Sequence, residues 1–264
     1  MHFTIRFVLF ACLALGLSGC QRPPESQESA AGGETAADAT TAPPCQLTMG
    51  WDPCSGTDFE LVRAIAREAD CSVDYQRDSW ANLLASVRTG EIDLISGATL
   101  TPEREAFALF SEPYRTERFA MYIRAGDADR FAGESLEEML ANGMRLGVTD
   151  AYLYGPTVQT LQDDPRFADQ FVVAAVGETS ATRLLDGVID GFLEDVFVAT
   201  SVLRRRGLED VVKAHPMELE SGGEVRLMFS RATVPAEVLA RFDAGLQRLR
   251  ETGRYEDIEG QYIR

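Results

Sequence analysis

The stretch 97–114, GATLTPEREAFALFSEPY, groups an arginine and a hydroxyl side chain behind a short apolar segment, which suits anion binding. We expect a buried strand over 92–95, with Gly97 and Thr99 just past its carboxyl end. The Thr-Pro pair that follows is typical of a capped helix start, and Arg104 would lie in that first turn. A guanidinium offers a planar fork of donors, and a helix start favours negative charge. The stretch predicts a carboxylate site; the alternative is an ordinary turn with a surface arginine that binds nothing.

The elements that must position this stretch alternate between strand and helix, which predicts a parallel α/β sheet with right-handed crossovers. Ligands of such sheets usually lie past the carboxyl ends of the strands. The pattern restarts near residue 135 with no long linker, which predicts two lobes around a cleft. The expected strands are 46–50, 72–75, 92–95, 119–123, 144–148, 190–193, 211–214 and 225–229, and the expected helices are 58–68, 80–87, 135–141, 180–187, 235–251 and 255–262.

Composition excludes several classes of function. The chain has 264 residues and 45% hydrophobic content, enough for two modest lobes. A formal net charge of −17 argues against nucleic acid and anionic membrane surfaces as partners. The only histidines are His2 and His215, so we expect neither a histidine-rich metal site nor a histidine-dependent triad. We expect no metal and no cofactor.

The first residues are typical of an export signal. Residues 1–20 hold Arg6 followed by a short apolar run of signal-peptide length, too short to span a bilayer comfortably. They end in Leu-Ser-Gly-Cys, which closely resembles the bacterial lipobox, in which Cys20 becomes the lipidated N-terminus. The alternative is a plain secretory peptide with a coincidental cysteine. Residues 21–44 have almost no large apolar side chains and predict a disordered tether.

Cysteine positions predict one disulfide. Cys45, Cys54 and Cys71 remain after the lipidated residue, and an exported chain meets an oxidising compartment. Cys45 begins the first strand and Cys71 immediately precedes the second, so both lie at the same end of neighbouring parallel strands. Cys54 lies on the order of 15 Å away, past the opposite end, whereas bonded pairs need Cα atoms within about 7 Å. We predict a Cys45–Cys71 bond with Cys54 free or partly buried; the alternative is no disulfide.

Several sequence blocks resemble the bacterial extracellular solute-binding proteins of family 3, the polar amino-acid receptors of ABC importers. The blocks are GTDFELVRAIA at 56–66, Trp80, GEID at 90–93, TPER at 101–104 and FSEPY at 110–114. Their order and spacing cover nearly the whole body of the chain.

This resemblance implies a fold. The family has an α/β, two-lobed type II periplasmic binding protein fold, with mixed or parallel sheets flanked by helices. The first lobe would comprise 45–121 plus 226–264, and the second lobe 122–225.

The resemblance also implies binding roles for two charged residues. Arg104 would pair with the ligand α-carboxylate, beside Thr99 and Gly97. Asp195 in the second lobe would receive the α-amino group, so the ligand would bridge the cleft and stabilise a closed state. For Asp195, the alternative from its residue type is a helix N-cap.

Two aromatic residues complete the implied site. Trp80 would stack on the ligand side chain, or would only plug the edge of the sheet. Tyr152 stands where the family usually has Thr or Ser after a Gly, and Ala151 replaces that Gly. The loop 51–56 is shorter than usual and lacks the family's aromatic residue, which leaves the identity of the ligand open.

The predicted function is a periplasmic, lipid-anchored and monomeric receptor that binds an amino acid or similar polar solute for an inner-membrane ABC permease. We expect no enzymatic activity. One alternative is a cleft enzyme of the cyclohexadienyl (arogenate) dehydratase type with Glu194 as general acid. Another is a ligand-sensing module for a separate signalling partner.

Overall fold

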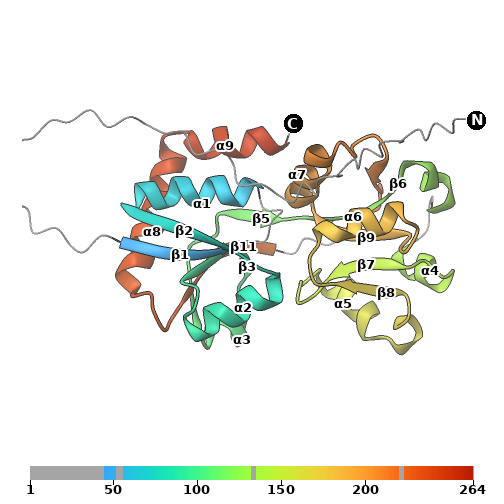
Figure 1. Cartoon of the computed structure of the whole chain (residues 1–264), viewed down its shortest axis with the longest axis horizontal. Coiled ribbons are helices and arrows are strands. Elements are labelled where there is room, and N and C mark those ends of the chain that lie inside the picture. The colour runs from blue at the N-terminus through green and yellow to red at the C-terminus, as the bar shows by residue number, and fades with distance from the viewer. Residues whose placement is uncertain (1–44, 52–55, 132–134, 220–222, 264) are drawn as a thin grey trace, which may run out of the picture. The chain divides into compact units, whose positions relative to one another are not determined.

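The computed structural model describes residues 45–51, 56–131, 135–219 and 223–263 (Figure 1). All of them belong to one unit of the chain, Thr40–Arg264. The expected leader, the expected tether and Cys54 lie outside the described residues. Among the described residues, no helix combines the length and the apolar character that crossing a bilayer requires.

The first lobe is built on a six-stranded mixed sheet in the order β2-β1-β3-β11-β4, with β5 also paired to β11. Strand β1 runs parallel to β2 and β3, whereas β11 runs antiparallel to β3, β4 and β5. The strands are β1 (Cys45–Trp51), β2 (Cys71–Arg77), β3 (Leu94–Thr99), β4 (Ala108–Phe110), β5 (Arg115–Glu117) and β11 (Gly223–Ser230).

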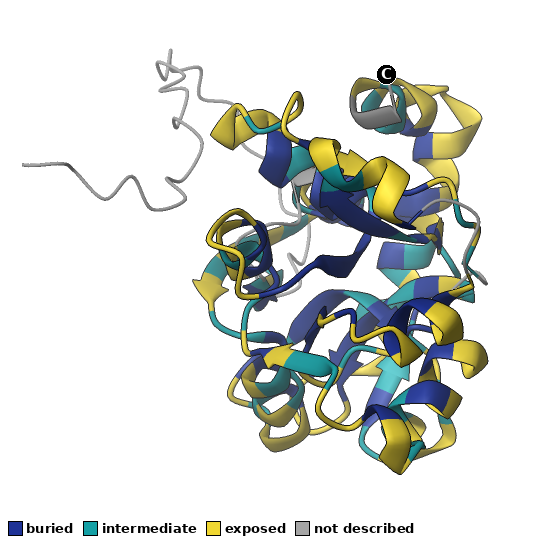
Figure 2. Cartoon of the chain, turned by 90° about the vertical axis from the view of Figure 1, so that its right-hand side faces the viewer, coloured by how far each residue is buried: buried dark blue, intermediate teal, exposed yellow. Residues whose placement is uncertain are grey.

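Helices cover both faces of this sheet because its strands alternate their side chains between two apolar clusters. Leu94 and Phe229 pack with Leu61 and Phe242 on one face, and the next residue along β3, Ile95, packs with α2 on the other. Figure 2 shows the strands mostly buried and the outward sides of the helices exposed. The helices are α1 (Gly56–Glu68), α8 (Ala236–Glu251) and α9 (Arg254–Ile263), opposite α2 (Trp80–Thr89).

The second lobe has a five-stranded sheet in the order β10-β6-β9-β7-β8. Its strands are β6 (Phe119–Arg124), β7 (Leu146–Thr149), β8 (Phe171–Ala174), β9 (Gly191–Asp195) and β10 (Val212–Ala214). Its helices are α4 (Leu136–Ala141), α5 (Pro156–Asp163), α6 (Glu178–Leu185) and α7 (Val196–Arg206), with 3₁₀ helices at Ala125–Phe131 and Pro165–Phe167.

The disulfide prediction is confirmed. Cys45 and Cys71 face each other in the parallel register of β1 and β2, with Cα atoms 4.6 Å apart, and their sulfur atoms are bonded. The bond closes the βαβ unit that carries α1.

Two expectations about the chain path need correction. Strand β3 extends to Thr99, so Gly97 and Thr99 lie within it rather than past its end, because antiparallel pairing with β11 prolongs the strand. The chain also passes from one sheet to the other earlier than the expected lobe limits. Residues 119–121 already pair in the second sheet, and 223–225 already pair in the first.

Candidate ligand-binding site

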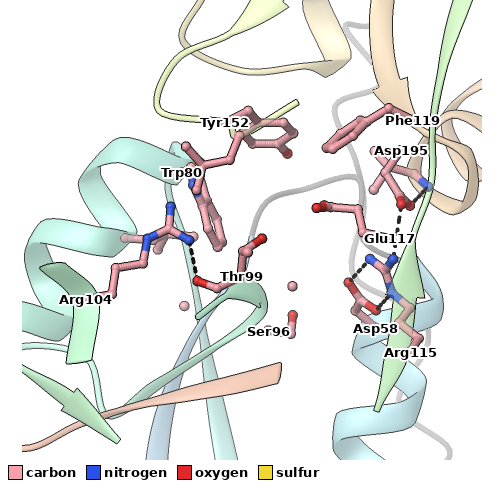
Figure 3. Close-up of a pocket in the computed structure, with 15 residues that line it drawn as sticks. Asp58, Trp80, Ser96, Thr99, Arg104, Arg115, Glu117, Phe119, Tyr152 and Asp195 are labelled. Atoms are coloured by element: carbon pink, nitrogen blue, oxygen red, sulfur yellow. Dashed lines mark hydrogen bonds and ion pairs between the residues drawn. The ribbon is translucent and has the colours of Figure 1, made fainter. Parts of the chain in front are cut away.

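A pocket of about 570 Å³, counting its open mouth, lies between residues of the two lobes (Figure 3). Small-molecule sites usually combine apolar walls with a few convergent polar groups. All six side chains or backbone positions predicted for the site line this pocket. The lining residues are Gly50, Asp58, Trp80, Leu83, Ser96, Gly97, Thr99, Arg104, Arg115, Glu117, Phe119, Tyr152, Leu153, Asp195 and Val198.

Arg104 is fixed by a single helical turn, α3 (Pro102–Glu105). Thr101 caps this turn by accepting a hydrogen bond from the Arg104 backbone N–H, as its residue type predicted. The Arg104 Nη1 donates to the Thr99 carbonyl at 2.9 Å, which aims the guanidinium along the pocket wall (Figure 3). Burial lowers the pKa of Arg104 below its usual value, and the Glu117 carboxylate opposes that shift.

Gly97 has a positive φ of 72°, which a side chain would strain. Its N–H donates to the Tyr114 hydroxyl at 2.8 Å. The Gly97 N–H is therefore already engaged within the protein, and Tyr114 holds this part of β3 in place.

Trp80 begins α2 behind the N-cap Ser79 and forms a wall of the pocket. Its indole Nε1 donates to the Ala151 carbonyl of the second lobe at 3.2 Å. The Arg104 guanidinium lies 5.8 Å from its ring. Trp80 is thus both an aromatic surface beside the cation and a direct link between the lobes.

Tyr152 packs edge-on against Trp80, with ring centroids 5.9 Å apart, and also contacts Phe119 and Tyr154. The preceding Ala151 has a φ of 59°, in the left-handed region that glycine prefers. This backbone conformation explains why the family that the sequence resembles usually has Gly at this position.

Asp195 performs the capping role that its residue type allowed. Its Oδ1 accepts from the backbone N–H groups of Phe197 and Val198 at the start of α7. Its Oδ2 accepts from Arg115 Nη1 at 3.1 Å and from the Arg118 N–H at 3.3 Å. Burial raises the pKa of Asp195, and the Arg115 guanidinium opposes the rise.

Sequence reasoning missed the ion network around Arg115. This buried guanidinium binds Asp58 of α1 through two parallel hydrogen bonds of 2.8 and 3.0 Å and reaches Asp195 with its third nitrogen. It therefore joins the first lobe to the helix start of the second. A sequence signal existed: the charged Arg115 and Glu117 occupy alternate positions just before the apolar run 119–123.

Glu117, at the end of β5, is the third carboxyl group of the pocket and was also missed. It is 8% exposed. Burial raises the pKa of Glu117 to about 8, with Asp195 adding to the rise while Arg115 and Arg104 oppose it. Figure 3 shows its carboxyl group directed into the space between Trp80 and the Arg115–Asp58 pair.

Glu194, the acid of the enzymatic alternative, does not line this pocket. It is buried in β9, and its Oε1 accepts from the Asp195 backbone N–H at 3.0 Å. It lines a small separate cavity with Phe192 and Leu203. Within the described part of the chain, no group of His, Cys, Asp and Glu side chains is arranged to hold a metal ion.

Two α/β lobes with a charged and aromatic pocket between them suit the binding of a small polar solute. Residues 35–264 match the model of the bacterial extracellular solute-binding proteins, family 3, and the chain belongs to this family. It is 23% identical over 260 residues to a probable histidine-binding protein of Neisseria gonorrhoeae, a match covering 96% of this chain and 92% of that one.

Solved structures confirm the predicted fold. An ancestral arginine-binding protein bound to arginine matches with a TM-score of 0.70 and 21% identity, covering 83% of this chain and 98% of that one. An amino acid ABC transporter substrate-binding protein from Streptococcus pneumoniae, bound to L-arginine, matches with a TM-score of 0.67 and 17% identity, covering 81% and 92%.

Proposed function

We propose that the chain is an extracytoplasmic receptor that binds an amino acid between its lobes and delivers it to an inner-membrane ABC permease. The observation that carries this proposal is the charge layout of one pocket. A half-buried guanidinium, Arg104, and carboxyl groups line the same space beside an aromatic wall. A zwitterion needs cationic and anionic partners within a few ångströms of each other.

Arg104 is the proposed partner of the ligand carboxylate. Its Nη1 donates to the Thr99 carbonyl, and the guanidinium lines the pocket, so its other N–H donors would meet a carboxylate there. Trp80 would lie against the ligand beside it. Binding that touches both lobes stabilises their association, which is the property that a permease can recognise.

A thermal-shift screen of the twenty L-amino acids, followed by calorimetry, tests the proposal. Arg104→Ala should weaken binding of the best ligand by about 10- to 100-fold, because a charge-assisted hydrogen bond is lost. Arg63→Ala is the matched control, since Arg63 is exposed on α1. Unchanged affinity in Arg104→Ala would refute the carboxylate assignment, and no shift with any amino acid would refute the receptor function.

We also propose that Cys20 anchors the protein to a membrane through a lipid. Metabolic labelling with a radioactive fatty acid should mark the wild-type protein and leave Cys20→Ala unlabelled. Soluble periplasmic wild-type protein without label would contradict the anchor. Copurification with a permease, rather than with a signalling kinase, would support import over the sensing alternative.

A further inference from the structure

Three carboxyl groups line the pocket, and two of them, Asp195 and Asp58, are bound to Arg115. A carboxylate offers about four lone-pair sites. Asp195 accepts four hydrogen bonds, from Phe197, Val198, Arg115 and Arg118. Donors of the protein itself therefore occupy the acceptor sites of the Asp195 carboxylate.

Asp58 is bound to both Nε and Nη2 of Arg115. Each of its carboxylate oxygens accepts from a different nitrogen of Arg115, at 2.8 and 3.0 Å. The paired geometry neutralises the charge of Asp58 inside a buried site. An ammonium group that took the place of Arg115 at Asp58 would leave a buried guanidinium short of partners, which is costly.

Glu117 has a different place in the pocket. It follows Arg115 by two residues in β5, so the two side chains lie on the same face of the strand. Its carboxyl group points to the middle of the pocket, on the side facing Trp80 and Thr99 (Figure 3). Arg104 interacts with Glu117 electrostatically from across this space. A zwitterion with its carboxylate at Arg104 would therefore present its ammonium group toward Glu117.

We propose that Glu117, rather than Asp195, receives the ammonium group of the bound amino acid. This assignment rests on the proposed receptor function and adds a specificity-determining residue to it. Asp195 and Asp58 then act as positioning residues, since they hold Arg115 and, through β5, the strand that carries Glu117.

Ligand binding should then be coupled to loss of a proton. The surroundings of Glu117 hold its pKa at about 8, so it is mostly protonated at neutral pH. An ammonium group favours the ionised carboxylate, and the proton must leave when the ligand binds. The titratable or charged groups that face Glu117 are Arg104 from α3, Asp58 from α1, Arg115 from β5, Asp195 from β9, and Tyr154 from the segment after β7.

The affinity should therefore rise with pH. A group that must lose a proton to bind costs about tenfold in affinity for each pH unit below its pKa. Wild-type affinity should rise about tenfold per unit from about pH 5.5 to about pH 7.5 and level off above about pH 8. Calorimetry of the wild-type protein near pH 7 in phosphate and in Tris, whose ionisation heats differ, should show that protons are released as the ligand binds.

The experiment compares wild type, Glu117→Gln and the control Glu60→Gln, which changes an exposed glutamate of α1. The probe is L-arginine, the ligand in both matched solved structures. Where it gives no thermal shift, the amino acid with the largest shift replaces it. Above pH 8, Glu117→Gln should bind about 10- to 100-fold more weakly than wild type. Its affinity should not vary with pH, and the difference should vanish toward pH 6. Glu60→Gln should match wild type throughout.

A second probe separates the α-ammonium group from a cationic side chain. The 2-hydroxy analogue of the amino acid lacks the ammonium group, so it should bind wild type without the tenfold slope. A retained slope with this analogue would overturn the assignment. An amino acid that binds with the same affinity and pH profile to wild type and Glu117→Gln would overturn it while leaving the receptor function intact. Absence of binding by all twenty amino acids would overturn both.

Discussion

The stability of the ligand-free protein should depend on pH through Glu117. Its pKa is raised from 4.5 to about 8 in the folded protein, mainly by burial. The folded protein thus holds this proton more tightly than the unfolded chain. The contribution of Glu117 to the free energy of unfolding is therefore highest below about pH 4.5. This contribution falls as the pH rises toward about 8. The gap of 8 − 4.5 = 3.5 pKa units corresponds to a loss of about 5 kcal/mol.

Glu117→Gln should remove that loss, because a glutamine resembles the protonated carboxyl group and does not titrate. Urea unfolding followed by tryptophan fluorescence gives the measurement at several pH values between about 4.5 and about 8.5. The variant should equal wild type at the acidic end and exceed it by several kcal/mol at the basic end. Glu60→Gln controls for the loss of one acidic residue. A difference between Glu117→Gln and wild type that stays constant across this range would refute the reasoning.

Two further perturbations test the framework that holds the pocket. Arg115→Met should lower the free energy of unfolding by about 3–5 kcal/mol, because two buried carboxylates lose their cation; a loss below about 1 kcal/mol in urea unfolding would contradict this account. Reduction of the Cys45–Cys71 bond, which spans 26 residues, should cost about 3.5 kcal/mol by the chain-entropy relation. An unchanged urea midpoint in dithiothreitol, with complete reduction verified by thiol labelling, would be inconsistent with that role.

Local patterns in the sequence predicted the features that depend on residues close together in the chain. The alternation of apolar segments predicted the βαβ unit, and its geometry alone selected the partner of Cys45 among the remaining cysteines. Thr101 as a cap for the turn of Arg104 was likewise readable, since the bond joins residues only three apart. The family resemblance then grouped Arg104 with Asp195, and the structure places both on one pocket.

The network around Arg115 could not be predicted in this way because its partners are distant in sequence. Arg115 lies 57 residues from Asp58 and 80 residues from Asp195. Whether a buried carboxylate can bind a ligand depends on such contacts, and the spacing of residues in the sequence does not predict them. The length of β3 escaped prediction for the same reason, since its partner β11 begins at Gly223.

The position of β11 sets an order for the assembly of the two lobes. All strands of the second sheet lie between Phe119 and Ala214, so this sheet can close as soon as that segment is available. The first sheet starts earlier in the chain but has β11 between β3 and β4. A chain that is synthesised from its N-terminus therefore has an incomplete first sheet while the second lobe folds. At that stage the edge of β3 that pairs with β11 is unpaired. Exposed strand edges of this kind are sites of misassembly, so a chaperone acting at this stage would meet the first lobe with the edge of β3 open.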